Sequence, residues 1–282
     1  MKTFIPQIRT KNPTSAPLRG QLGDFSMRSM VRLGSRTSIE DAYPRKPIDR
    51  PVIEINTIDA IENSRSKLLM KACFSEAGVP QADWWIPEPE KPWNLLSQTG
   101  VTSSEYLPYP ILIKRVFGFK GRGMLKIDTQ EQLDEWIQNN LHATSWYIEH
   151  YRPFAREYRL HCTQSECFMT WRKLRRADAE NRWFFNSTNC NWVGEDHPLF
   201  DRPSNWGAIV ETCINATKAV GLDITAIDVR VQSSNKTNPE FIVLECNSAP
   251  ALGDQGVEIY KQKIKELINE KITKYNEEIS NR

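Results

Sequence analysis

Residues 239–250 read Pro-Glu-Phe-Ile-Val-Leu-Glu-Cys-Asn-Ser-Ala-Pro, an apolar strand that is interrupted by a carboxylate and an amide. Successive side chains of a strand point to opposite sides, so residues two apart share a face. Glu245 and Asn247 therefore project together. Carboxylate and amide oxygens are hard ligands of the kind that magnesium prefers. The pattern predicts a magnesium site at the end of this strand.

The strand that precedes it in the sequence carries a second carboxylate in an apolar setting. Residues 224–231 read Ile-Thr-Ala-Ile-Asp-Val-Arg-Val, and Asp228 lies on the face opposite the aliphatic residues beside it. Asp228 is therefore a further candidate metal ligand. An alternative for the two strands is a hairpin in which Glu245 forms an ion pair with Arg230. The two strands alone favour neither interpretation.

Length and composition limit the number of lobes, the kinds of partner and the cellular compartment. A chain of 282 residues allows roughly two lobes, and its formal net charge of +2 indicates no general preference for polyanions. Residues 1–50 hold ten Lys and Arg against four Asp and Glu. This composition favours a solvated tail, with a nucleic-acid-binding arm as the alternative. Six cysteines without a C-x-x-C pair, and no apolar run of membrane-spanning length, predict a cytoplasmic protein with no membrane partner.

Periodicity along the chain alternates between strands and helices, which is typical of an α/β or α+β enzyme. The predicted strands cover residues 51–56, 109–116, 124–127, 146–149, 157–161, 224–231 and 239–247. The predicted helices cover residues 66–74, a segment from residue 129, residues 208–220 and a long closing segment with apolar residues at three-four spacing. Residues 80–110, rich in Pro and Trp, are predicted to be a connecting region.

A glycine-rich loop follows the strand that ends in Lys114 and precedes another strand. Its glycines, which allow backbone N–H groups to approach phosphate oxygens, are Gly118, Gly121 and Gly123. It also carries two basic side chains, Lys120 and Arg122. The strand–loop–strand context excludes the usual Rossmann and Walker arrangements. The loop is either a phosphate-binding lid or an ordinary hairpin with a basic tip.

The segment after the next strand has the features of a nucleotide hinge. Residues 147–151 leave an apolar strand for a linker whose free backbone groups would suit an adenine edge. Beyond it, Glu157 offers two acceptor oxygens to ribose hydroxyls. Glu157, Arg159 and His161 share one strand face, and a surface ladder of alternating charge is the simpler interpretation of that face.

Taken in order, these features resemble the ATP-grasp superfamily. Its members carry a helical lysine, a lysine before a flexible glycine-rich loop, an acidic hinge, and a late Asp followed by Glu-x-Asn. The matching positions are Lys67, Lys114, residues 118–123, residues 149–157, Asp228 and residues 245–247. The resemblance covers residues 65–255. It is closest to carboxylate–amine ligases of the D-alanine–D-alanine ligase and ribosomal-protein glutamate ligase types, and it extends to uncharacterised ATP-grasp proteins of phage genomes.

The resemblance implies an α+β fold in which two α+β subdomains clasp ATP. We expect a short irregular N-terminal segment at residues 1–64, which includes the basic arm. A small subdomain with the glycine-rich lid would cover residues 65–170. A catalytic subdomain with the metal site and the closing helix would cover residues 171–282. The reduced N-terminal segment implies an open acceptor site, suited to a protein, a peptide or a modified nucleic acid.

Roles for single residues follow from the same resemblance. The ATP-binding residues would be Lys67, Lys114, Gly118, Gly121, Gly123, Glu149 at adenine and Glu157 at the ribose. Two magnesium ions, or manganese in their place, would be held by Asp228, Glu245 and Asn247, with Glu245 bridging. The candidates for steadying the γ-phosphate and the tetrahedral intermediate are Arg159, Arg172 and Lys173. For residues 172–176, a solvated basic strand end is the alternative.

The implied activity is an ATP-dependent ligase that activates a carboxylate as an acyl-phosphate and joins it to an amine. A kinase of the same fold and a non-catalytic, ATP-regulated nucleic-acid-binding module are the alternatives. Two departures argue against D-alanine as the substrate. Ala226 stands where those ligases carry an arginine, and Pro250-Ala251 replaces their Pro-Gly. Residues 248–250, just past the metal strand, are expected to border the acceptor pocket.

Overall fold

The structure is a computed structural model. It describes residues 4–5, 30–34, 52–88, 91–97, 100–118, 121–140, 145–180, 183–186, 189–233, 237–252 and 254–281. Lys120 and most of the basic arm lie outside these described residues. The predicted contact of that arm with nucleic acid therefore stays a prediction.

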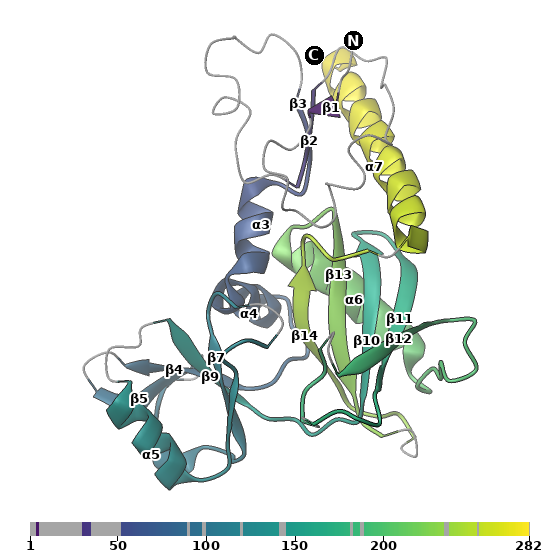
Figure 1. Cartoon of the computed structure of the whole chain (residues 1–282). Helices are drawn as coiled ribbons and strands as arrows, with labels where there is room; N and C mark the ends of the chain where they lie inside the picture. The colour runs from purple at the N-terminus through teal and green to yellow at the C-terminus, as the bar shows by residue number, and fades with distance from the viewer. Residues whose placement is uncertain are drawn as a thin grey trace.

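A six-stranded sheet forms the lower lobe in Figure 1, in the order β6-β5-β4-β9-β7-β8. Its strands are β4 (Trp84–Glu88), β5 (Lys91–Ser97), β6 (Gly100–Ser103), β7 (Ile111–Arg115), β8 (Leu125–Ile127) and β9 (Trp146–His150). Helix α5 (Gln130–Asn139) packs on this sheet through Leu133 and Ile137, which are buried with Leu95 and Ile113. A short 3-10 turn, η1 (Ser104–Tyr106), leads into β7.

The prediction that residues 80–110 only connect other elements is wrong, because β4, β5 and β6 lie there. Proline is tolerated at the irregular points of a sheet, where no ladder hydrogen bond is lost. Pro87 lies at such a point, since the β4–β5 register shifts between Pro87 and Glu88. The apolar residues of this segment still reach the core, and Leu95 is fully buried.

A five-stranded antiparallel sheet forms the second lobe, in the order β12-β11-β10-β13-β14. Its strands are β10 (Arg156–Thr163), β11 (Cys167–Arg175), β12 (Cys190–Gly194), β13 (Ile224–Val231) and β14 (Phe241–Asn247). Helices α4 (Lys67–Glu76) and α6 (Trp206–Val220) share a core with this sheet. Every residue of β13 is buried, which explains why its sequence is almost continuously apolar.

Local capping fixes the ends of these two helices. The Ser66 hydroxyl accepts a hydrogen bond from the Leu69 N–H at the start of α4. That helix ends at Ala77, before Gly78 with a φ of +66°. Helix α6 ends at Gly221, whose φ of +83° lies in the left-handed region that favours glycine.

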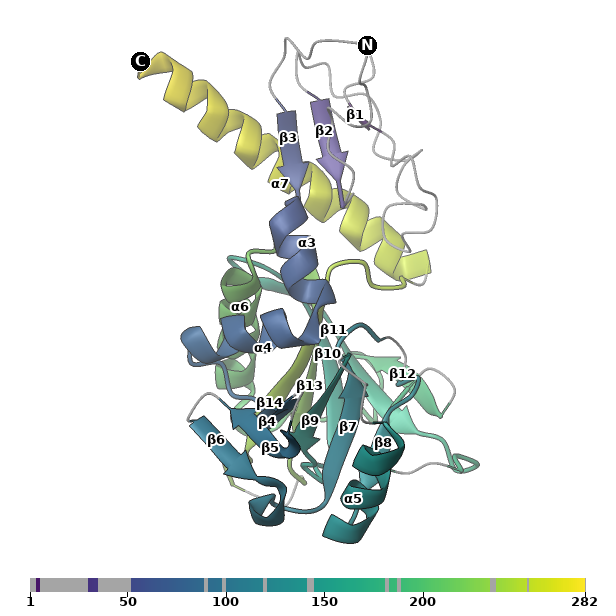
Figure 2. The same ribbon diagram turned by 90° about the vertical axis from the view of Figure 1, so that its left-hand side faces the viewer.

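A third, parallel sheet joins β1 (Phe4–Ile5), β2 (Met30–Leu33) and β3 (Val52–Ile55). The closing helix α7 (Asp254–Ser280) crosses this sheet in Figure 2. The predicted apolar stripe of this helix packs against β2 and β3, in a core that contains Leu33, Ile53, Ile55, Ile224, Tyr260, Ile264, Ile268 and Ile272. Helix α3 (Ile58–Arg65) links β3 to α4.

The pairing of strands divides the chain earlier than the sequence suggested. The predicted subdomain boundary at residue 170 falls inside β11, and β10 already pairs with both β11 and β13. The change from one large sheet to the other therefore lies in residues 151–155, between β9 and β10. Helix α4, placed by sequence in the small subdomain, shares the core of the second sheet.

Two further expectations concern the chain as a whole. All six cysteines are unbonded, as the lack of paired spacing predicted. In the part of the chain that the structure describes, no helix combines the length and the apolar character needed to cross a bilayer.

Candidate functional site

A cavity of about 950 Å³ is lined by residues of both large sheets, of α4 and of the glycine-rich loop. It brings together eleven of the thirteen residues that the sequence predicted: Lys67, Lys114, Gly118, Gly121, Glu149, Glu157, Arg159, Lys173, Asp228, Glu245 and Asn247. Gly123 and Arg172 are not part of the lining. Of residues 248–250, expected to border the acceptor pocket, Ala249 and Pro250 line the cavity and Ser248 does not, and the lining continues through residues 251 and 252.

The lining carries an excess of positive charge. It contains eight Lys and Arg side chains, namely Lys67, Lys114, Arg115, Arg122, Arg152, Arg159, Lys173 and Arg230. Against them stand four carboxylates, namely Glu149, Glu157, Asp228 and Glu245. A cleft lined mainly by one sign of charge concentrates ligands of the other sign. The cavity is therefore suited to a multiply charged anion.

The predicted metal ligands lie side by side at the floor of the cavity. The register of β13 and β14 places Asp228 opposite Glu245. Glu245 binds the Lys67 ammonium at 2.6 Å and accepts a hydrogen bond from the Asn247 amide at 3.2 Å. Burial alone would lower the pKa of Lys67, but the Glu245 carboxylate outweighs burial and raises it. Burial alone would raise the pKa of Glu245, but the Lys67 ammonium outweighs burial and lowers it.

The alternative ion pair between Glu245 and Arg230 is wrong. Arg230 instead donates from Nε to Glu157 at 3.0 Å, while Lys67 is the partner of Glu245. The reason is the register, in which Arg230 lies opposite Ile242 and two residues beyond Asp228.

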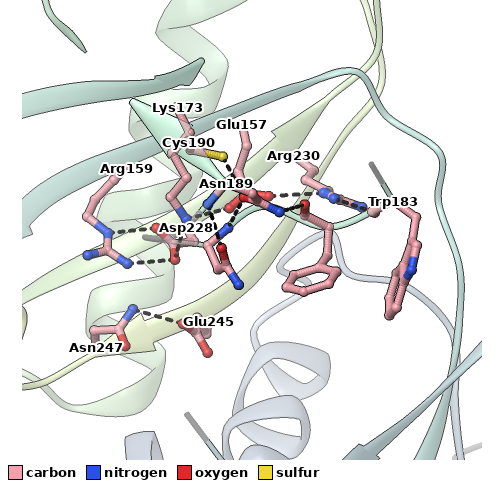
Figure 3. A network of polar contacts seen from close by, with 12 residues as sticks. Glu157, Arg159, Lys173, Trp183, Asn189, Cys190, Asp228, Arg230, Glu245 and Asn247 are labelled. Atoms are coloured by element: carbon pink, nitrogen blue, oxygen red, sulfur yellow. Dashed lines mark hydrogen bonds and ion pairs between the residues drawn. The ribbon is translucent and has the colours of Figure 1, made fainter. Parts of the chain in front are cut away.

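Arg159 on β10 and Lys173 on β11 hold Asp228 (Figure 3). The Arg159 guanidinium binds both Asp228 oxygens, at 2.7 and 2.8 Å, and Lys173 approaches Oδ2 at 3.1 Å. Burial alone would raise the pKa of Asp228, but these two cations hold it well below its usual range. Both cations also lie over the Trp192 ring, 4.8 and 5.0 Å from its centroid. The carboxylate is thus ionised and fixed in place.

Glu157 is enclosed by cations and does not lie on a surface ladder. Its side chain is 3% exposed and binds Lys173 at 2.5 Å and Arg230 at 3.0 Å. Arg230 also donates to the carbonyl of Trp183 at 2.9 Å, as Figure 3 shows. Both carboxylate oxygens of Glu157 therefore have buried partners, and its predicted contact with a ribose stays a prediction.

Glu149 is shared by two lysines at the hinge. Its Oε1 binds Lys114 at 2.5 Å and its Oε2 binds Lys71 at 2.8 Å. Burial alone would raise the pKa of Glu149, but Lys114 and Lys71 lower it to about 2. Lys71 escaped the sequence prediction. The only signal was a lysine four residues after Lys67, on the same side of the helix as that residue.

Gly121 and Gly123 of the loop have different neighbours, which leave little room for a side chain. At Gly121, with a φ of +71°, an added Cβ would lie 3.0 Å from Cε2 of Phe184, which follows β11. A residue of the second lobe thus touches the loop of the first. At Gly123, with a φ of +72°, an added Cβ would meet Arg115 and Trp146. Gly123 therefore allows the base of the loop to pack closely. It does not line the cavity, where its predicted role in ATP binding would require it to be.

His161 lines the cavity, although the sequence analysis assigned it no role. Its Nδ1 lies 2.7 Å from the Tyr260 hydroxyl, so that α7 contacts the cavity wall. Burial, with the neighbouring Arg159, lowers the pKa of His161 to about 3, and the imidazole is neutral near pH 7. No local pattern connects two residues so far apart in sequence.

Arg172 lies on the wrong face for the role that sequence assigned to it. Its neighbours Trp171 and Lys173 line the cavity, so alternation along β11 directs Arg172 to the other side. There it donates to the Leu199 carbonyl at 2.5 Å and forms an ion pair with Asp201. The prediction of a catalytic Arg172 is therefore corrected.

This placement predicts that Arg172→Met changes turnover by less than about twofold. Lys173→Met, one residue along the strand, should reduce turnover at least about a hundredfold, because it removes a cation that touches Asp228. Steady-state assays of ADP formation compare the two variants. A loss in Arg172→Met as large as that in Lys173→Met would contradict the strand-face argument.

The predicted metal site contains oxygen donors only. Within the described ranges, no group of three His, Cys, Asp or Glu side chains is arranged to hold a metal. The predicted site consists of two carboxylates and one amide oxygen, all hard donors, and both carboxylates have lowered pKa values. Lys67, Arg159 and Lys173 supply the positive charge around them. The residues present fit magnesium.

Similar solved structures decide the fold. The D-alanine–D-alanine ligase of Bacillus anthracis matches with a TM-score of 0.55 and 11% identity, over 80% of this chain and 73% of that ligase. The carboxyaminoimidazole ribonucleotide synthase of Aspergillus clavatus, solved with ATP, matches at 0.50 and 18% identity, over 70% and 48%. The chain has the ATP-grasp fold. At these identities the similarity defines the fold and not the reaction.

The ATP-grasp ligase PsnB, solved with a minimal precursor, is also similar, with a TM-score of 0.48 and 17% identity over 73% of this chain. The chain spans 58% of PsnB and 48% of the Aspergillus synthase. No family model and no curated protein sequence matches the chain. The ATP-grasp assignment therefore rests on the architecture of two α+β lobes around one cavity, as the sequence resemblance predicted.

Proposed function

We propose that this ATP-grasp protein is an ATP-dependent ligase, which activates a carboxylate as an acyl-phosphate and joins it to an amine. One observation carries the proposal. A single cavity between the two lobes brings the phosphate-binding candidates Lys67 and Lys114 together with Asp228, Glu245 and Asn247. A pure nucleotide-binding module has no need of that second, acidic group.

The ATP half of the proposed site is cationic. Lys67 and Lys114 reach the cavity from α4 and β7, and each forms an ion pair with a glutamate. ATP phosphates would compete for both ammonium groups. Gly118 and Gly121 would allow the loop backbone to approach the same phosphates. The contact of Phe184 with Gly121 would help to close the loop and exclude water.

The acidic half would hold magnesium through Asp228, Glu245 and Asn247. A bound magnesium ion neutralises charge on the phosphoryl group that is transferred, which is a main source of catalysis in this chemistry. Arg159 fixes the orientation of the Asp228 carboxylate through two parallel hydrogen bonds. Lys173 connects Asp228 to Glu157, so that the acidic group and the hinge side of the cavity are held together.

The proposed reaction has two steps. A carboxylate oxygen of the acceptor attacks the γ-phosphorus of ATP, the bond to the β-phosphate oxygen breaks, and ADP leaves. An amine then attacks the acyl carbon, loses a proton and expels phosphate. Negative charge develops on oxygen in both steps, and Arg159 and Lys173, which contact Asp228, would stabilise it.

The acceptor would bind beyond the acidic group, where His161 and residues 249–252 line the cavity. Asn56 donates to the Ser248 carbonyl at 3.4 Å and to the Ile224 carbonyl at 2.9 Å. These bonds connect the start of the acceptor loop to β13. The loop is therefore supported from the third sheet and not held only by β14.

An assay of ADP release tests the proposal. Purified protein is incubated with ATP, magnesium, pooled carboxylates that include amino acids and peptides, and pooled amines that include polyamines. We expect ADP and phosphate only when a carboxylate and an amine are both present, and no ADP after EDTA treatment. ADP with a phosphorylated hydroxyl acceptor and no amine dependence would favour the kinase. No ADP with any acceptor or amine would favour the nucleotide-regulated binding module.

A further inference from the structure

Helix α4 contacts both lobes through two lysines one turn apart. Residues four apart on a helix share a side. Lys67 binds Glu245 on β14 of the second sheet, and Lys71 binds Glu149 on β9 of the first. The helix itself packs in the core of the second lobe through Met70 and Phe74. Lys71 is therefore an ionic link from this helix to the sheet that carries Lys114.

Lys71 is enclosed and does not line the cavity. Its side chain is 3% exposed, and that of Glu149 is 5% exposed. Besides Glu149 at 2.8 Å, its ammonium has the Gln81 side-chain oxygen at 3.3 Å and the Ala82 carbonyl at 3.5 Å. These three oxygens belong to residues that lead into the first sheet or form part of it. Lys71 thus cannot touch a ligand directly, but it holds a residue that does line the cavity.

The charges around Glu149 do not cancel. One carboxylate lies between two ammonium groups, Lys71 behind it and Lys114 at the cavity. The carboxylate is ionised, since its pKa is lowered to about 2. Burial lowers the pKa of Lys71, and the Glu149 carboxylate acts against that shift. With both lysines protonated, the three groups carry one surplus positive charge, and Lys114 is the cation among them that lines the cavity. Without Lys71, Glu149 would neutralise Lys114 and that surplus would disappear.

We propose that Lys71 is a positioning residue for ATP, which balances the charge of Glu149 so that the charge of Lys114 remains available to the phosphates. The inference rests on the proposed function, because it assumes that ATP occupies the cavity. It assigns to a residue without ligand contact a share of the affinity for ATP. Lys67 and Lys71 then have distinct tasks on one helix, the first at the phosphates and the second behind the hinge.

Binding of a non-hydrolysable ATP analogue with magnesium, measured by isothermal titration calorimetry, tests the role. Lys71→Met is expected to weaken binding at least about tenfold, because a buried charge near the phosphates is lost. Lys71→Arg keeps the charge and should bind within about threefold of the wild type. Lys218→Met is the matched control, since Lys218 is exposed on α6 and outside the cavity lining, and should bind as the wild type does.

A double variant separates charge balance from packing. In Lys71→Met/Glu149→Gln the surplus charge on Lys114 is restored, so we expect tighter binding than in Lys71→Met, by at least about threefold. A merely structural role of Lys71 predicts a further loss instead. Lys71→Gln also removes the charge while keeping a hydrogen-bond donor for Glu149. It serves as the test if the methionine variant does not fold, as judged by circular dichroism.

The outcomes are distinguishable. Equal binding by the wild type and by the folded uncharged variant would overturn the role of Lys71 and leave the proposed function intact. A double variant that binds no more tightly than Lys71→Met would do the same. No binding of the analogue by the wild type would overturn the proposed function, and this inference with it.

Discussion

Glu245→Gln is expected to abolish turnover, with a loss of at least about a thousandfold, while the protein stays folded. Glu245 lies opposite Asp228 across β13 and β14 and is the partner of Lys67. Glutamine has nearly the same shape but lacks the charge that both a metal ion and Lys67 require. Release of ADP measures the loss, and circular dichroism with a thermal unfolding curve measures the fold.

Glu240→Gln is the matched control. Glu240 precedes the same strand, but it is exposed and forms only a long ion pair with Arg152, at 3.9 Å. This variant should keep turnover within about twofold of the wild type. Full activity of Glu245→Gln would refute the metal assignment. Equal losses in both variants would show that the effect is not specific to the acidic group.

Glu157→Gln is expected to have the largest effect on stability, a loss of about 3–5 kcal/mol in the free energy of unfolding. Its carboxylate is the common partner of Lys173 and Arg230, and all three side chains are less than a tenth exposed. A neutral amide leaves two buried cations without adequate compensation. Urea unfolding should show a lower midpoint with an unchanged slope.

Glu166→Gln provides the comparison for this prediction. Glu166 also binds a lysine, Lys263 at 2.6 Å, but its side chain is 50% exposed. Exposed ion pairs contribute little, so the loss should be below about 1 kcal/mol. If the two variants lose the same amount, burial does not set the strength of the Glu157 network. A separate titration of Glu157→Gln with the ATP analogue then addresses the predicted ribose contact.

Several elements were predictable because their causes are local. Ser66 and Gly78 bound α4, Gly221 ends α6, and the apolar stripe of α7 meets β2 and β3. Capping, left-handed glycine and helical periodicity all act within a few residues. The strands within residues 80–110 were not predicted, because a segment rich in Pro and Trp is typical of a connection. Pairing with β9 and the burial of Leu95 outweigh this local preference.

The residues of the candidate site likewise divide into those that sequence could predict and those that it could not. Asp228, Glu245 and Asn247 could be predicted because a carboxylate or amide in an apolar strand is conspicuous in sequence. Arg172 was misassigned because residues 172–176 do not show which strand face is buried, and a shift of one residue reverses the face. Lys71 was missed because its partner, Glu149, belongs to another sheet.

By itself, then, the sequence determined the order of the ATP-grasp elements, the identity of the acidic group and the lysines before the glycine-rich loop. Those follow from residue type, spacing and strand alternation. Only the tertiary structure decided which charges meet: Lys67 with Glu245, Arg159 with Asp228, and Lys71 with Lys114 around Glu149. The physical reason is that electrostatic energy depends on distance and burial, and both are set by the packing of two sheets and one helix.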